Sequence, residues 1–157
     1  MLFQGTESNE GNAQFSPDGH WIAYDSDSTG RSEVYVREFR PGSDGKSSDG
    51  KPEATPTHPI STGGGISPRW RGDGKELFYV SGDQKRIISV DIATKPDFQF
   101  SATKLSVPAP LGVRANIPVF PAVTSDGQRF LVDMPAAQNN GPQQFTVVLN
   151  WPALLKK

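Results

Sequence analysis

The residues of this sequence best suited to bind a metal ion lie in the segment Asp25-Ser26-Asp27-Ser28-Thr29-Gly30. Asp25 and Asp27 carry carboxylates at alternate positions and a glycine stands at the sixth position, as at the start of a calcium-binding loop. The twelfth position of such a loop holds a glutamate, but here it is Val36, and strands are expected on both sides. The segment therefore predicts either a calcium site at Asp25 and Asp27 or, more simply, a polar hairpin connection.

A second pair of carboxylates, Asp44 and Asp49, lies in the segment PGSDGKSSDGKPEATP, residues 41–56. Few apolar residues and many glycines, serines, prolines and charges are typical of a mobile surface loop. Ordering such a loop around a cation costs roughly 1 to 2 kcal/mol per residue. We expect a solvated loop here rather than a cation site.

The sequence contains no motif for a nucleophilic or phosphate-binding centre. His20 and His58 stand in no local pattern with a nucleophile, and no G-x-S-x-G string occurs. The glycines at 63–65 lack the Lys-Ser/Thr pair of a phosphate loop. The absence of cysteine excludes disulfides, thiolate zinc sites and cysteine nucleophiles.

Cationic and amide side chains at two places are candidates for holding a ligand. Arg69 and Arg71 flank Trp70, and alternate residues of a strand share a face, so both arginines point away from the tryptophan. Arg114 and Asn116 lie in an irregular segment, APLGVRANIP. We predict a ligand site at Arg69, Arg114 and Asn116, provided that the fold brings these segments together.

The elements that must position these side chains are marked by a turn that occurs three times. The strings FSPDGHWIAY, WRGDGKELFYV and VTSDGQRFLV begin at Phe15, Trp70 and Val123, and their Asp-Gly pairs are 55 and 53 residues apart. The aspartate can accept bonds from the backbone ahead of it, and the glycine tolerates a positive φ. Each turn is followed by two strings of β-branched and aromatic residues, which predict strands.

These repeats, at about residues 12–62, 66–107 and 117–149, predict the architecture. Several short strands repeated at a regular spacing are typical of a β-propeller. We therefore expect an all-β fold in which residues 1–157 form a single domain with three four-stranded blades. We assign the aromatic residues of the repeat strands to packing between blades: Trp21, Tyr24, Tyr35, Phe78, Tyr79 and Phe130. Trp70 and Phe15, which occupy the same place in their repeats, are both expected in the core.

The outer strand of each blade is the least regular part of the pattern. Pro59–Thr62 is predicted to close the first blade, and Lys104–Val107 the second. No such string follows the third repeat. A short apolar string at Leu2–Gly5 is the candidate that closes a last blade.

Composition narrows the classes of function. The net charge is −1 and no basic stripe stands out, so there is no electrostatic basis for nucleic-acid binding. No apolar run approaches the roughly 20 residues of a membrane span. The first residues, MLFQGTESNE, do not have the pattern of a signal peptide. Composition does not fix the compartment.

The string FSPDGHWIAYDSDSTGRSEVYV closely resembles the repeat of the TolB-like β-propellers, a WD-like family. WRGDGKELFYVSGDQKRIISVDI resembles it without the Ser-Pro pair, and VTSDGQRFLVDM more loosely. With its ending FTVVLNWPALLKK, the chain is similar to the C-terminal end of propellers found behind bacterial serine/threonine kinase domains. The resemblance implies a propeller fold and, from the family, a periplasmic location. It does not specify an activity, because propellers host many.

Three blades do not close a ring, since propellers typically have four to eight. An open arc would expose apolar faces and strand edges at both ends. We therefore expect a homodimer that forms one six-bladed ring, in which Leu2–Gly5 of each chain completes the last blade of the other. The alternative is that the chain is a fragment of a longer product.

Two functions are compatible with these residues. The first is a binding module with a surface for a protein or small-molecule ligand at the central channel. The alternative is a calcium-dependent propeller hydrolase of lactones or esters, in which the ion polarises the carbonyl and activates water. Calcium is the one candidate cofactor.

Overall fold

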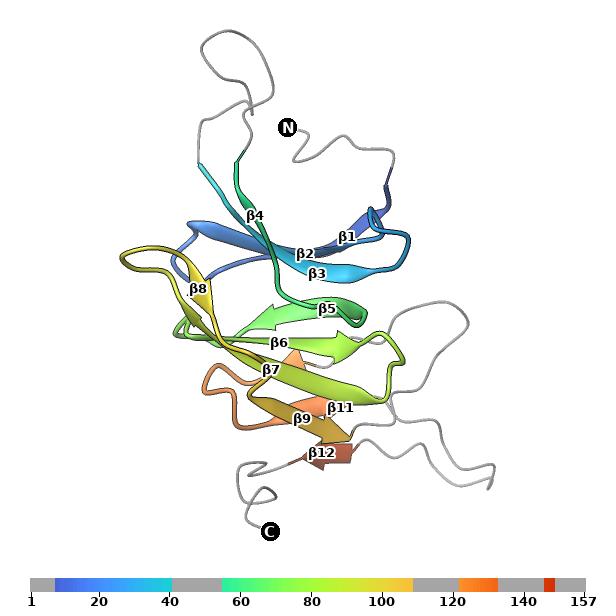
Figure 1. The fold of residues 1–157 in the computed structure, drawn as a ribbon. Coiled ribbons are helices and arrows are strands. Elements are labelled where there is room, and N and C mark those ends of the chain that lie inside the picture. Colours follow the sequence, from blue (N-terminus) through green and yellow to red (C-terminus); the bar gives the residue numbers. More distant parts are fainter. Residues whose placement is uncertain (1–7, 41–54, 109–121, 133–145, 149–157) are drawn as a thin grey trace, which may run out of the picture.

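The computed structural model describes residues 8–40, 55–108, 122–132 and 146–148, which form antiparallel strands and no helix. The strands make three sheets that follow one another in sequence and lie one beneath the other in the same order (Figure 1). No segment within the described ranges is a helix long and apolar enough to cross a membrane. The prediction of an all-β fold is confirmed.

The first sheet has the strand order β1-β2-β3-β4. Its strands are β1 (Glu10–Phe15), β2 (Trp21–Ser26), β3 (Glu33–Glu38) and β4 (Thr57–Pro59). The outer strand therefore lies earlier than the predicted segment Pro59–Thr62. Beyond Pro59, the N–H of Ile60 still donates to the carbonyl of Val34 (2.8 Å), but the N–H of Val34 donates to the hydroxyl of Ser61 (2.8 Å) instead of to a backbone carbonyl, so the regular ladder ends.

The second sheet is built around its longest strand, β7. Its strands are β5 (Gly65–Trp70), β6 (Glu76–Ser81), β7 (Arg86–Ala93), β8 (Gln99–Phe100) and β9 (Leu105–Pro108). One part of β7 pairs with β9, which confirms the predicted outer strand at Lys104–Val107. The end of β7 pairs instead with β8, in a hairpin that the sequence pattern did not predict.

The third sheet has three strands within the described residues, in the order β10-β11-β12. They are β10 (Ala122–Val123), β11 (Phe130–Val132) and β12 (Thr146–Val148). The predicted strand at Leu2–Gly5 lies outside the described residues.

The three Asp-Gly turns have the predicted conformation. Their glycines have φ values of 73°, 71° and 71° at Gly19, Gly74 and Gly127. In the first turn, Asp18 accepts the hydroxyl of Ser16 (2.5 Å) and the N–H of His20 (3.1 Å). Ser16 Oγ in turn accepts the N–H of Trp21 (3.0 Å), so two short side chains close the hairpin. The third turn repeats this pattern with Thr124, Asp126, Gln128 and Arg129.

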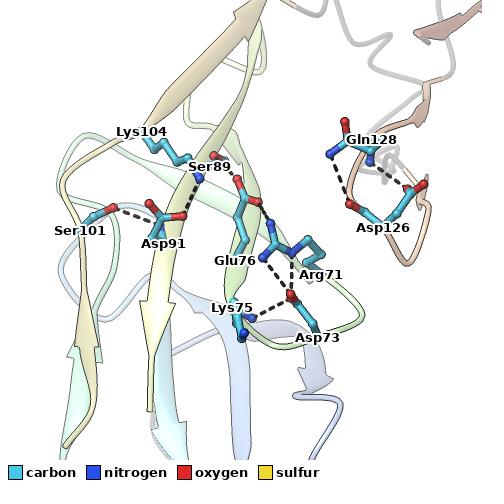
Figure 2. A network of polar contacts seen from close by, with 10 residues as sticks. All are labelled: Arg71, Asp73, Lys75, Glu76, Ser89, Asp91, Ser101, Lys104, Asp126 and Gln128. Carbon is cyan, nitrogen blue, oxygen red and sulfur yellow. Dashed lines mark hydrogen bonds and ion pairs between the residues drawn. The ribbon is translucent and has the colours of Figure 1, made fainter. Parts of the chain in front are cut away.

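The second turn replaces the hydroxyl residue by Arg71 (Figure 2). Its guanidinium donates to both oxygens of Asp73 (2.7 and 2.9 Å) and to the carboxylate of Glu76 (2.6 Å). The bonds from Arg71 lower the pKa of Asp73 to about 2. Glu76 is buried and also accepts the hydroxyl of Ser89 (2.7 Å), so the turn is tied to the interior of its sheet.

Apolar clusters join each sheet to the next. The first cluster lies between the first and second sheets and includes Ala23, Val34, Trp70, Leu77 and Tyr79. The second lies between the second and third sheets and consists of Phe78, Ile87, Phe130 and Val132. Phe78 and Phe130 meet edge to face with ring centroids 5.1 Å apart, so these two aromatics pack between sheets as predicted.

The expectation that both Trp70 and Phe15 lie in the core is half right. Trp70 is 5% exposed, and its indole N–H donates to the carbonyl of Gln14 on the neighbouring sheet (3.2 Å). Phe15 is 54% exposed. The difference has a physical reason: Trp70 has a preceding sheet to pack against, whereas no described sheet precedes the first one.

The unpredicted β7–β8 hairpin reaches across to the first sheet. Phe98, within this hairpin, stacks on His58 of β4 (centroids 4.3 Å apart) and contacts Trp21 of β2 (4.6 Å). Trp21 therefore packs between sheets through a partner that lies outside the repeat pattern.

Glu33 anchors the passage from the first sheet to the second. Its buried carboxylate accepts bonds from the hydroxyl of Ser61, from Arg31 Nε (2.6 Å) and from the N–H of Gly64 (3.0 Å). Burial alone would raise the pKa of Glu33, but the bonds from Ser61, Arg31 and Gly64 outweigh it, so the pKa is lowered from its ordinary value of 4.5. A carboxylate with a lowered pKa stabilises the fold while ionised, and its contribution is lost as the pH falls through that pKa.

Glu33→Gln is therefore expected to lower the free energy of unfolding by about 2 kcal/mol at pH 7, because the bonds to the charge are lost. The deficit should shrink at a second, acidic pH below the lowered pKa of Glu33, where the wild-type carboxylate is protonated as well. Urea unfolding at both pH values measures this. The control is Glu38→Gln, which removes an exposed ion pair with Arg40 and should change stability by no more than about 1 kcal/mol. An equal deficit at both pH values would contradict the role of the Glu33 charge.

Candidate functional site

The first strands of the first two sheets carry matching backbone irregularities. The register of β1 with β2 shifts between Gly11 and Gln14, and that of β5 with β6 between Ile66 and Arg69. Within these bulges the φ of Asn12 is 59° and that of Ser67 is 61°. Left-handed residues other than glycine are strained and cluster at functional sites. The two residues are 55 positions apart, the same spacing as the turns.

Asp25 lies between these two bulges. It is 7% exposed, and its Oδ2 accepts the side-chain amide of Asn12 (2.7 Å) and the N–H of Ser67 (2.7 Å). The first bond stays within the first sheet, whereas the second crosses to the next. The carboxylate predicted as a calcium ligand thus joins two sheets at their bulged strands.

Ser67 and Arg69 bring polar groups into the junction of the second and third sheets. They line a narrow crevice with Phe78, Val123 and Phe130, which has no room for a water-sized sphere. Ser67 is 1% exposed, and its hydroxyl has no hydrogen-bond partner among the described residues. A buried hydroxyl without a partner costs roughly 1 to 3 kcal/mol, which marks it as a candidate contact for a ligand.

Arg69 is the one predicted ligand-binding residue that lies within the described residues. Burial lowers its pKa, and the charge of Asp25 raises it in part. One guanidinium nitrogen donates to the carbonyl of Pro68 (2.7 Å). Arg69 therefore lies beside Ser67 in a partly desolvated setting, where a cation interacts strongly with an anion. Arg114 and Asn116 lie outside the described residues, as do Asp44 and Asp49.

The two predicted calcium ligands have separate partners. Asp27 is partly exposed and accepts the N–H and side-chain amide of Asn9 (both 2.8 Å), bonds that lower its pKa. Asp25 is buried and bonded as described above. The described residues contain no group of three or more acidic or histidine side chains that could hold a metal. Asp25 and Asp27 have separate partners, and no further acidic or histidine side chain of the described residues joins them, so as arranged they supply too few ligands for the ion and a calcium site there stays a prediction.

A more open groove lies between the first and second Asp-Gly turns and the end of β7. It measures about 400 Å³, and its charged lining is Asp18, Asp73, Lys75 and Lys95. Both carboxylates already accept bonds within their own turns. Within the described residues neither lysine makes an ion pair. The groove has the size of a small-molecule pocket.

Sequence patterns did not predict most of the site at the bulges of β1 and β5. Asn12 and Ser67 read as ordinary polar residues of a strand, and nothing local marks a left-handed backbone. Their shared 55-residue spacing, together with the enrichment of asparagine in this conformation, is the signal that could have identified them.

Comparison with known proteins adds to this geometry. One matching solved structure is the crystal structure of a putative 6-phosphogluconolactonase from Bacteroides uniformis, with a TM-score of 0.55 and 16% sequence identity. The fold resembles part of a propeller-type lactonase. The match covers 93% of this chain and 42% of the Bacteroides protein, so the chain spans less than half of that length. No protein-family model and no curated protein matches the chain.

The roles of the two aspartates can be separated by substitution. Asp25→Ala would leave the N–H of Ser67 and the amide of Asn12 without their acceptor, and we expect stability to fall by about 2 to 3 kcal/mol. Asp27→Ala, which removes only bonds to Asn9, should change stability much less than Asp25→Ala. Urea unfolding of both variants measures the difference. Equal effects of the two substitutions would contradict the account of Asp25 as a junction between sheets.

Proposed function

We propose that the three sheets are successive blades of a β-propeller related to the TolB-like proteins, and that this propeller hydrolyses lactones or esters. The observation that carries the proposal is the fold likeness over 93% of the chain to a protein whose name describes a lactonase. At 16% identity this likeness concerns the fold, so the activity must be argued from residues of this chain.

Ser67 and Arg69 supply the chemistry that such a reaction needs at the carbonyl. When water attacks a lactone, negative charge develops on the carbonyl oxygen, and preorganised donors stabilise it. The Ser67 hydroxyl is a buried donor without a partner among the described residues, and the Arg69 guanidinium stands beside it. Because the crevice is closed to a water-sized sphere, the substrate would bind at its mouth, and the two sheets would have to move apart slightly for it to reach both groups.

The part of calcium in this reaction is left to experiment. A bound ion would polarise the carbonyl and lower the pKa of water. Asp25 and Asp27, as they are arranged, supply too few ligands to hold it.

A second candidate is a module that binds a ligand without turnover. The open groove between the first two turns favours it, because Lys75 and Lys95 present cations there beside carboxylates that are already bonded. Such a groove would hold a small anionic molecule, and none of its residues suggests a nucleophile or general base.

Hydrolysis of a panel of sugar-acid lactones and aryl esters, followed by pH-stat, distinguishes the two functions. The hydrolase proposal predicts turnover by the wild type and a loss of about 100-fold in kcat/KM for Ser67→Ala, the typical effect of removing one such donor. Arg69→Gln should lose a similar factor. Lys104→Gln, which removes an exposed ion pair with Asp91, is the control and should retain activity.

Two outcomes would change the proposed function. Absence of turnover across the panel, with saturable binding that Lys75→Gln weakens, would favour the binding module. Turnover that is lost with EDTA and restored by calcium would establish the metal, and the Asp25→Ala and Asp27→Ala variants would then show which carboxylate holds it.

A further inference from the structure

The two ends of the stack of sheets carry residues that belong to an interface found twice inside this chain. The evidence is the strand register. Phe15 pairs with Ile22 in the first sheet, Trp70 with Leu77 in the second and Val123 with Phe130 in the third. Phe15, Trp70 and Val123 therefore occupy one structural position, at the end of the first strand of each sheet.

This position is buried wherever another sheet precedes. Trp70 is 5% exposed in the cluster between the first two sheets. Val123 packs against the cluster between the second and third. Phe15 is 54% exposed, and its ring contact among the described residues is an edge-to-face contact with Phe39, with centroids 4.9 Å apart. Phe15 thus has the place of a packed residue without a sheet to pack against.

The face that each sheet turns toward the following sheet shows the same pattern, but here the exposed residue lies in the last sheet. One position on the second strand of each sheet is held in turn by Ala23, Phe78 and Leu131. Their partners on the first strands are Gln14, Arg69 and Ala122, respectively. Ala23 is 0% exposed and Phe78 is 2% exposed, each in the cluster shared with the following sheet. Leu131, on the middle strand of the third sheet, is 46% exposed. A large apolar side chain at this position is covered only when another sheet follows.

We propose that these two ends bind each other in a second copy of this chain. The Phe15 end (Phe15 and Phe39) of one copy packs against the Leu131 end (Leu131 and Ala122) of the other. The ends lie on opposite sides of the stack (Figure 1), so one copy cannot join its own ends. Two copies that each use both ends make a closed ring with two-fold symmetry.

The contact is confined to these ends. Ile22 and Tyr24 share the outward face of the first sheet with Phe15, but they are 4% and 3% exposed and thus already covered. The second copy therefore meets the Phe15 end and not the whole face. Three sheets from each copy give six, within the range in which propellers close. The proposal does not depend on the hydrolase activity.

Light scattering behind a sizing column tests the proposal, because the chain has a mass of 17.0 kDa and a dimer has twice that mass. We expect the wild type to elute as the dimer. Leu131→Glu and Phe15→Lys each place a charge in both contacts of the ring, so each variant alone should fall to the monomer mass. Phe100→Glu is the matched control, since Phe100 is 41% exposed and lies on β8 of the second sheet, which belongs to neither end.

An equimolar mixture of Leu131→Glu and Phe15→Lys gives the sharpest result. One contact of the mixed dimer then pairs the glutamate with the lysine, and the other keeps the wild-type Leu131 and Phe15. The mixture should regain the dimer mass, whereas each variant measured alone should have the monomer mass. Far-UV circular dichroism confirms that the variants are folded.

Two results would overturn the proposal. A wild type with the monomer mass of 17.0 kDa at every concentration would mean that no second copy covers the ends. Other parts of a longer chain would then cover them, or they would stay exposed. A dimer that survives both charged substitutions would place the contact between copies elsewhere.

Discussion

A sheet of three to five short strands has two faces, and this chain covers them by laying one sheet on the next. Trp70 is the clearest case: its ring fills the junction of the first two sheets and both of its N–H groups bond to Gln14 across that junction. Fully burying a large apolar side chain contributes roughly 2 to 3 kcal/mol, so the junctions hold much of the stability. Everything proposed for this chain depends on these contacts between sheets.

The same junctions place the polar groups. A strand that bulges can direct an N–H out of its own ladder. Ser67 does so toward Asp25, while its side chain faces the following sheet. The bulge thus links one junction to the next, at the cost of a left-handed backbone and a hydroxyl that has no partner in the part of the chain that the structure describes. Strain of this kind persists where the surroundings fix it, and the two junctions around β5 provide that fixing.

A feature of this structure could be predicted from the sequence when the residues that cause it lie close together in the chain. The Asp-Gly turns are set by side chains two to five residues apart, so their strings predicted the hairpins and their spacing. Phe15 and Trp70 look alike in sequence and differ only in whether a sheet lies beside them. The alternation of Asp25 with Asp27 is visible in the sequence and makes Asp25 a candidate calcium ligand, whereas its partner Ser67 lies 42 residues away and no local pattern links the two. The β7–β8 hairpin and its Phe98 follow no repeat, so no pattern indicated them.

The most direct test of this account is amide hydrogen exchange, followed by NMR, at Ser67 and Trp70. Both residues lie on β5, an edge strand, and their N–H groups bond to the side chains of Asp25 and Gln14 on the first sheet (2.7 and 3.0 Å). If the sheets pack as described, both amides exchange as slowly as those in the ladder between β6 and β7, because they are released only when the sheets separate. Exchange as fast as that of exposed turn amides, while the ladder stays protected, would contradict the packing of the sheets and the site built on it.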